Sequence, residues 1–206
     1  MELALVRHGQ TGWNAAGMFR GRADIDLDDT GVRQAGLLAG YLAGEPVTAV
    51  YSSPLKRAIG TAAAIAAASK LEVKTAPGLI DFDYGAWQGR SLEELRDTKL
   101  YREWLEHPES VRMPGGESLA DVRQRALETV NAIVKQTTGL AVLVSHRVVN
   151  KVLICALLGL DNSRFWNIRQ DNAAISVFEH KEGRYILKRH NDTCHLKSLP
   201  NLDTDF

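Results

Sequence analysis

A short apolar segment near the start of the chain limits the folds open to it more than any other feature. Residues Leu3 to Val6 form an unbroken apolar run, which is typical of a strand buried on both faces and is too short for a helix. Arg7 and His8 follow directly, and Gly9 and Gly12 supply permissive backbone for the turn after them. The run therefore predicts a strand in a covered sheet, with a cation and an imidazole at its carboxyl end.

Similar apolar runs recur along the chain and alternate with helical patterns. This alternation predicts an α/β fold, a three-layer α/β/α sandwich around a mainly parallel mixed sheet. Thr30 is expected to cap the first long helix, with Val32 in its apolar stripe. The expected strands are 3–6, 47–51, 71–75 and 140–144, the expected helices are 30–42, 54–69, 118–136 and 148–158, a hairpin is expected at 174–179 and 185–189, and residues 191–206 are expected to form an irregular tail.

Length and composition bound the function. At 206 residues the chain is expected to form one domain over residues 1–206. Basic and acidic residues both number 25, so the net charge gives no general attraction to nucleic acid or to an anionic membrane. Cys155 and Cys194 make no disulfide framework, and no run is apolar enough to span a membrane. We therefore expect a cytoplasmic protein that binds neither nucleic acid nor membrane.

The segment from about residue 80 to 117 differs in composition from the rest of the chain. Trp87, Trp104, Tyr84 and Tyr101 gather there with prolines and a Gly-Gly pair. We expect a small lid-like insertion with short helices at 92–96 and 101–106. Its aromatic side chains are expected to form the segment's own small core rather than a substrate cage, and they are also the best candidates for specificity.

Three candidate functional residues follow three different strands. His8 follows the first strand, Arg57 lies in the first turn of the helix after the second, and His146 follows the strand at 140–144. The carboxyl ends of parallel strands meet at one edge of a sheet, and ligands bind there. The topology therefore predicts one site, in which the start of a helix around Arg57 already favours an anion.

Four sequence motifs resemble those of the histidine phosphatase superfamily, the phosphoglycerate mutase-like enzymes. They are Arg-His-Gly-Gln-Thr-x-Trp-Asn from residue 7, Ser-Ser-Pro-Leu-x-Arg-Ala from residue 52, Leu-Ile-Asp-Phe-Asp-Tyr-Gly-Ala-Trp-Gln-Gly from residue 79, and Val-Ser-His from residue 144. The resemblance covers nearly the whole chain and implies a phosphoglycerate mutase-like fold.

The resemblance implies a role for each matched residue. His8 is the nucleophile and is transiently phosphorylated. Arg7 and Arg57 grip the phosphate with permanently charged guanidinium groups, and two such cations also favour the neutral, nucleophilic form of His8. His146 donates to the phosphoryl oxygens. The further phosphate-binding or substrate-binding candidates are Asn14, Arg20, Gln10, Thr11 and Arg147.

The general acid departs from the family's pattern. The family usually has Glu where this chain has Asp81, four residues before Gly85. A carboxyl group facing a dianionic phosphate should be partly protonated, as a general acid requires, but Asp is shorter by about 1.5 Å in reach. Asp81 is the expected acid, and Asp83 is the alternative.

The reaction expected from these motifs is hydrolysis of small-molecule phosphomonoesters without a metal or other cofactor. Mutases of the family carry an adjacent pair of arginines after the acid motif, whereas Arg90, Arg96 and Arg102 are scattered here. The Pro-Gly-Gly-Glu-Ser stretch from residue 114 also resembles the phosphatase branch, which includes α-ribazole phosphatases. The alternatives are phosphoglycerate mutase-type transfer and a non-catalytic phospholigand-binding protein, the latter prompted by Asp81 and by Arg147, where the family has Gly. The partners expected are a small phosphomonoester and, at most, a second copy of the chain in a homodimer.

Overall fold

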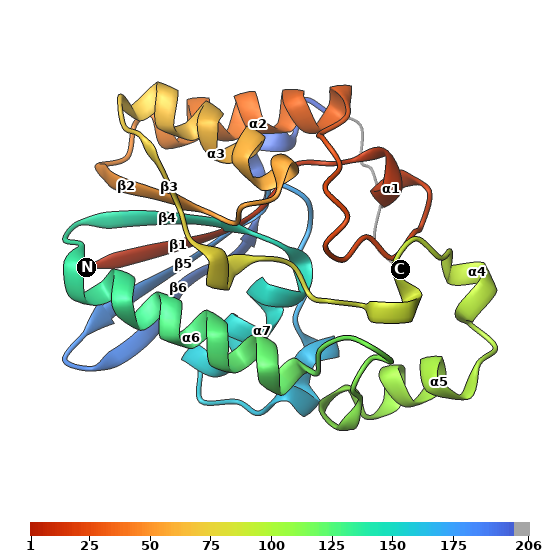
Figure 1. The fold of residues 1–206 in the computed structure, drawn as a ribbon. Helices are drawn as coiled ribbons and strands as arrows, with labels where there is room; N and C mark the ends of the chain where they lie inside the picture. Colours follow the sequence, from red (N-terminus) through yellow and green to blue (C-terminus); the bar gives the residue numbers. More distant parts are fainter. Residues whose placement is uncertain (200–206) are drawn as a thin grey trace.

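A six-stranded mixed sheet forms the centre of the molecule (Figure 1). The computed structural model describes residues 1–199. The strand order is β3-β2-β4-β1-β5-β6. The first four strands in this order run parallel, and β5 runs antiparallel to both of its neighbours, β1 and β6. The strands are β1 (Glu2–Arg7), β2 (Val47–Ser52), β3 (Val73–Thr75), β4 (Leu140–Ser145), β5 (Ile175–Lys181) and β6 (Arg184–Asp192).

Alternate residues of the buried strands enter two hydrophobic cores, one on each side of the sheet. Leu3 and Leu5 belong to the core that α6 and α7 cover, whereas Ala4 and Val6 belong to the core under α2 and α3. The expected three-layer α/β/α sandwich is therefore confirmed (Figure 1). The long helices are α2 (Asp29–Leu42), α3 (Lys56–Ser69), α6 (Leu119–Gln136) and α7 (Arg147–Leu157).

Short helices occupy the loops at the carboxyl edge and the insertion. They are α1 (Gly12–Ala15), α4 (Leu92–Leu95), α5 (Lys99–Glu106), and the 3-10 turns η1 (Pro77–Leu79), η2 (Gly85–Trp87), η3 (Pro108–Ser110), η4 (Asn162–Asn167) and η5 (Cys194–Leu196). The two helices predicted in the insertion are present as α4 and α5. Trp87 and Trp104 do not form a separate small core as predicted, because both are buried in the same cluster as the sheet's Leu3 and Leu5.

Four local predictions were wrong. Helix α2 is capped by Asp28, whose side chain accepts from the Gly31 N–H, so Thr30 lies inside the helix. Val32 is 58% exposed and therefore lies outside the buried face of α2, which includes Ala35, Leu38 and Leu42. The third strand is shorter than expected, and the predicted irregular tail begins with the end of β6 and the turn η5, while residues 200–206 lie outside the described part.

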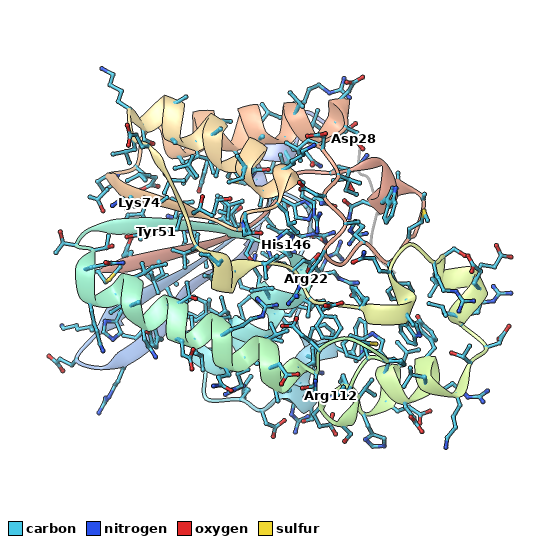
Figure 2. The ribbon with its side chains drawn as sticks, in the orientation of Figure 1. Arg22, Asp28, Tyr51, Lys74, Arg112 and His146 are labelled. Atoms are coloured by element: carbon cyan, nitrogen blue, oxygen red, sulfur yellow. The ribbon has the colours of Figure 1, made fainter. Side chains whose placement is uncertain are left out.

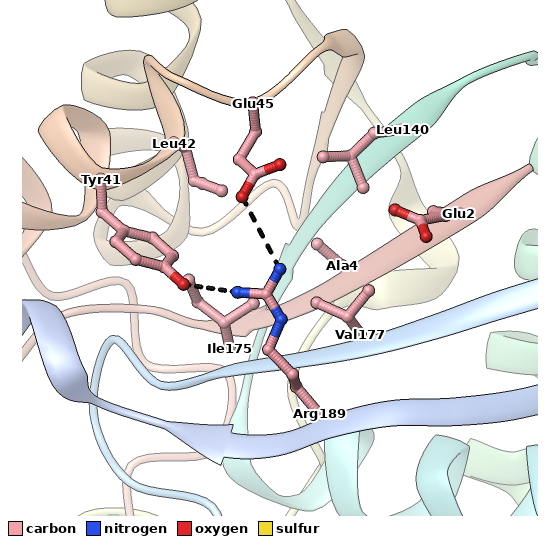
Figure 3. A pocket seen from close by; sticks show the side chains of 9 residues that line it. All are labelled: Glu2, Ala4, Tyr41, Leu42, Glu45, Leu140, Ile175, Val177 and Arg189. Carbon is pink, nitrogen blue, oxygen red and sulfur yellow. Dashed lines mark hydrogen bonds and ion pairs between the residues drawn. The ribbon is translucent and has the colours of Figure 1, made fainter.

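The β5–β6 hairpin is joined to α2 by Arg189. Its guanidinium donates to the Tyr41 hydroxyl at 2.5 Å and lies 3.6 Å from Glu45 (Figure 3). The hollow beside these side chains has a volume of about 10 Å³, which is room for about one water molecule. It is a gap in packing rather than a ligand site. Within residues 1–199, no helix has the length and apolarity needed to cross a membrane.

Candidate active site

The parallel strands bring His8 and His146 face to face at the carboxyl edge of the sheet. His8 follows β1, and His146 lies between β4 and α7, near the centre of the molecule in Figure 2. Because β1 and β4 are adjacent, the two imidazole centroids are only 5.2 Å apart, with their planes at 58°. Arg57 enters from the first turn of α3, after β2. The topology thus places together the three residues that the strand ends predicted.

The hydrogen bonds of His8 define its reactive nitrogen. Nδ1 lies 2.6 Å from the carbonyl oxygen of Gly9, and because a carbonyl only accepts, Nδ1 must carry the ring proton. The lone pair is therefore on Nε2. Burial, first of all, and then the positive charges of Arg57, Arg7 and Arg20 and the neighbouring His146, hold the pKa of His8 well below its ordinary value of 6.5. His8 is consequently neutral and suited to nucleophilic attack near neutral pH.

Ser53 is the hydrogen-bond partner of His146 Nε2. Its hydroxyl lies 2.7 Å from His146 Nε2 and also accepts from the Leu55 N–H at 3.4 Å. The Ser53 hydroxyl can donate to Nε2, and in that arrangement the ring proton is on Nδ1, which lies 3.6 Å from an Asp81 oxygen. Burial, followed by nearby arginines, lowers the pKa of His146 well below 6.5. A neutral ring with a proton on Nδ1 can donate to a phosphoryl oxygen.

Arg57 is fully buried and makes three hydrogen bonds. Nη1 donates to Ala23 O at 2.7 Å, and Nη2 donates to Gly21 O at 2.7 Å and to Asp81 Oδ2 at 2.9 Å. Its Nε has no hydrogen-bond partner. Burial lowers the pKa of Arg57, and the Asp81 carboxylate opposes that shift. Arg57 therefore both supplies charge and holds the neighbouring loop against α3.

The two candidate acids occupy different environments. Asp81 is 5% exposed, with one oxygen on Arg57 and the other accepting from the Phe82 N–H at 2.8 Å. Asp83 instead accepts from the Gly85 N–H at 2.9 Å and pairs with Arg22 at 3.3 Å. Only Asp81 is in contact with both Arg57 and His146, so the geometry favours Asp81 over Asp83.

The loop after β1 presents one further neutral donor. Thr11 caps α1, and its backbone N–H and hydroxyl donate to Asn14 Oδ1 at 3.0 and 2.9 Å. This fixes the Asn14 amide, leaving its buried Nδ2 with no hydrogen-bond partner. Gln10 Nε2 donates to Asp28 at 3.0 Å. Asn14 can therefore offer a donor to a ligand, while Thr11 and Gln10 shape the loop.

Three predicted site residues remain, and they differ in position. Arg7 is buried at the end of β1, where its Nη1 donates to Gln170 O at 2.6 Å. Arg20 donates to the Met18 carbonyl at 3.2 Å, and its charge contributes to the lowered pKa of His8 and of His146. The Arg147 guanidinium lies 5.5 Å from the ring centroid of Trp166, in a cation–π arrangement. Arg20 thus acts electrostatically on both imidazoles, whereas Arg147 is held over the aromatic ring of η4.

Sequence reasoning overlooked two residues around this site. Ser53 is part of the quoted Ser-Ser-Pro-Leu motif, and its place beside a strand end was a usable signal. Arg125 of α6 donates to the main-chain oxygens of residues 78, 80 and 81, and a sequence pattern does not predict contacts between a side chain and distant main chain. Among residues 1–199, no three His, Cys, Asp or Glu side chains are grouped to hold a metal ion.

Comparison with known proteins gives consistent matches. The family profile of the histidine phosphatase superfamily (branch 1) matches residues 3–193. Phosphoserine phosphatase 1 of Hydrogenobacter thermophilus is 41% identical, over 95% of this chain and 94% of that protein. The probable phosphoglycerate mutase GpmB of Yersinia pestis is 30% identical, over 98% of each. A mutant phosphoserine phosphatase from Entamoeba histolytica, solved in complex with phosphoserine, superposes with a TM-score of 0.86 at 30% identity, covering 95% of this chain and 98% of that one.

Proposed function

Because this chain belongs to the histidine phosphatase superfamily, we propose that it hydrolyses small-molecule phosphomonoesters through a phosphohistidine on His8. The family match and the phosphoserine phosphatase relatives make it a phosphomonoester hydrolase. The observation that carries the proposed mechanism is the buried His8, whose Nδ1 is fixed by Gly9 and whose Nε2 holds a lone pair among arginines.

The first step is attack of His8 Nε2 on phosphorus. The Nε2–P bond forms, the P–O bond to the ester breaks, and protonated Asp81 gives its proton to the leaving alkoxide. Arg7, Arg57 and the His146 Nδ1 proton stabilise the negative charge on the transferring group. The buried Nδ2 of Asn14 adds a neutral donor.

The second step releases inorganic phosphate. Water attacks phosphorus, the Nε2–P bond breaks, and the Asp81 carboxylate takes one proton from the water. His8 returns to its neutral form with Nδ1 still bonded to Gly9, and Asp81 is protonated for the next cycle. No step calls for a metal ion.

Mutase activity is the less favoured alternative. The mutase relative is 30% identical, whereas the phosphoserine phosphatase is 41% identical over a similar share of the chain. The scattered positions of Arg90, Arg96 and Arg102 also lack the adjacent arginine pair expected of the mutases. O-Phosphoserine is the first substrate we propose, since it is the substrate in the names of two relatives.

Three further properties belong to the proposal: a cover over the bound substrate, a location in the cytoplasm and assembly as a homodimer. We propose that residues 80–117 cover the bound substrate, because α4 and α5 lie beside the carboxyl edge with their aromatic residues anchored in the core. The free thiols of Cys155 and Cys194 suit the reducing cytoplasm. The predicted homodimer can be tested by size-exclusion chromatography with light scattering.

A phosphate-release screen tests the function. The wild type and His8→Ala are assayed on O-phosphoserine, other metabolite monoesters and p-nitrophenyl phosphate, with and without EDTA. We expect phosphate release by the wild type in both conditions and a loss of at least about 1,000-fold for His8→Ala. Thermal stabilisation by phosphate without turnover of any ester would instead indicate a binding protein, and interconversion of 2- and 3-phosphoglycerate would indicate a mutase.

A further inference from the structure

Arg125 of α6 joins the segment before the proposed acid to the far end of the insertion. Nη1 donates to Gly78 O at 2.8 Å and to Ile80 O at 2.6 Å, and Nη2 donates to Asp81 O at 3.2 Å. Nε and Nη2 also bond to the two carboxylate oxygens of Glu117, at 2.9 and 3.0 Å. One guanidinium therefore binds three carbonyl oxygens within residues 78–81 and is itself held by a bidentate carboxylate.

Glu117 is held from two further sides. Its Oε2 accepts from the Asp83 N–H at 3.0 Å, and its Oε1 lies 3.0 Å from Arg22 Nη2. Its backbone N–H donates to Asp83 O at 3.0 Å. The side chains of Arg125 and Glu117 are only 19% and 15% exposed, so solvent screens this pair weakly. The pair is thus a rigid support under the chain on both sides of Asp81.

The main chain at Gly78 lies directly against α6. A Cβ atom at residue 78 would come within 2.0 Å of the Thr129 hydroxyl and 2.8 Å of Arg125 O. This close approach is independent of the guanidinium bonds. Both involve the turn of α6 that runs from Arg125 to Thr129. The path of the chain into Asp81 is therefore set by that helix.

A fixed main chain matters more for Asp than for Glu. The aspartate side chain has only two torsions, so its carboxyl group follows the position of its own backbone. The Asp81 oxygens are bound to Phe82 N and Arg57, and the Asp81 carbonyl is bound to Arg125. A shift of about 1 Å can cost roughly a hundredfold in rate, so a short acid depends on this support.

We infer that Arg125, anchored by Glu117, is a positioning residue that holds Asp81 within reach of the leaving-group oxygen. The inference rests on the proposed function, in which Asp81 protonates the leaving group. Arg125 acts on the main chain of residues 78–81 and has no contact with the reacting atoms. It compensates for the shorter reach of aspartate at this position.

Leaving-group dependence separates positioning of the acid from general damage. Protonation is needed for the alkoxide of O-phosphoserine and much less for p-nitrophenolate. We expect Arg125→Gln to lower kcat/KM for O-phosphoserine about 10- to 100-fold and for p-nitrophenyl phosphate less than about threefold. Arg125→Lys, which keeps the charge without the fork, should lie between wild type and Arg125→Gln and serves if the glutamine variant fails to fold.

The matched control is Arg112→Gln. Arg112 also pairs with a carboxylate at the start of α6, Asp121 at 2.8 Å, and lies toward the lower edge in Figure 2, but its hydrogen bonds go to Asp121 and to Gly116 O rather than to residues 78–81. It should retain wild-type rates on both esters. In an Asp81→Asn background, Arg125→Gln should change kcat/KM by less than about twofold, because both act on one proton transfer.

The possible results distinguish the positioning role of Arg125 from the proposed phosphatase function. Equal loss on both esters, or full additivity of Arg125→Gln with Asp81→Asn, would overturn the inference while leaving the phosphatase intact. Selective loss on O-phosphoserine with no additivity supports it. A wild type that releases phosphate from no ester would instead remove the proposed function on which it rests.

Discussion

The two ring nitrogens of His8 have separate tasks in the proposed reaction. Nδ1 donates to Gly9 O at 2.6 Å, and this bond can persist while Nε2 carries the phosphoryl group. We therefore expect the trapped intermediate to be phosphorylated on Nε2. Nitrogen and phosphorus NMR of the acid-quenched, denatured enzyme distinguish the two phosphohistidine isomers, and phosphate on Nδ1 would contradict the assignment.

Ser53 allows a test of the proton position on His146. Ser53→Ala removes the partner of Nε2, so nothing then favours the tautomer with the ring proton on Nδ1, the atom that donates to the phosphoryl group in the proposed mechanism. Losing one buried hydrogen bond costs about 1–2 kcal/mol, so we expect kcat/KM to fall roughly tenfold. Nitrogen NMR should show a mixture of tautomers at His146.

The neighbouring serine is the control for this substitution. Ser52 is equally buried, but its hydroxyl donates to the Ser53 carbonyl at 2.8 Å and not to the imidazole. Ser52→Ala should keep a single His146 tautomer. If Ser53→Ala also keeps it, some other group orients the ring.

The site residues that could be predicted are those placed by a strand end. His8, Arg57 and His146 each follow a strand, and parallel strands end at one edge, so their meeting needs only the topology. Contacts to main-chain oxygens could not be predicted in this way. Arg125 is one polar residue on an amphipathic helix, and only the folded path of residues 78–81 gives it a role.

At the scale of elements, the start of α2 supports the loop that carries His8. A Cβ atom on Gly31 would lie 2.0 Å from Gln10 O, and one on Gly9 would lie 2.5 Å from Gly31 O. We expect Gly31→Ala to displace the loop by about 1 Å and lower kcat about a hundredfold. The measurement is phosphate release at saturating O-phosphoserine, together with the Tm.

Gly36 of the same helix provides the matched control. Nothing lies within 4 Å of a Cβ atom there, so Gly36→Ala should raise stability by about 0.5–1 kcal/mol through helix propensity, with unchanged kcat. A Gly31→Ala enzyme with wild-type kcat would show that the close approach does not position His8.

The boundaries of elements were less predictable than their existence. The long helices and the strands 3–6, 47–51 and 140–144 were predicted because continuous apolar patterns specify them. Asp28, Asp29 and Thr30 are all acceptable caps, and the choice of Asp28 depends on its bonds to Gly31 and Gln10. Helix α1 spans only Gly12–Ala15 and depends on the Thr11–Asn14 capping box, so it has no periodic signal.

At the scale of the whole molecule, burying two neutral imidazoles makes stability depend on pH. The pKa values of His8 and His146 are lowered in the folded protein, so below pH 6.5 the unfolded chain binds protons that the folded chain does not. Stability from these residues is complete above pH 6.5 and is lost as pH falls below it. Each such histidine contributes a slope of about 1.4 kcal/mol per pH unit.

The slope can be measured by urea unfolding between pH 6.5 and about pH 4.5. His190 and His195 also have lowered pKa values and add to it, whereas the strongly shifted carboxylate of Asp121, with a pKa of about 2, releases its stabilisation only as pH falls below about 3.8. His8→Asn should therefore reduce the slope by about 1.4 kcal/mol per pH unit, whatever it does to stability at pH 7.

The quantity to compare is the slope of the unfolding free energy against pH rather than the free energy itself, because replacing any buried side chain alters packing. An unchanged slope in His8→Asn would mean that His8 is protonated in the folded protein near pH 6, and a protonated imidazole cannot be the nucleophile. The same pH series thus tests whether His8 is neutral in the folded protein, as the proposed mechanism requires, independently of which ester the enzyme hydrolyses.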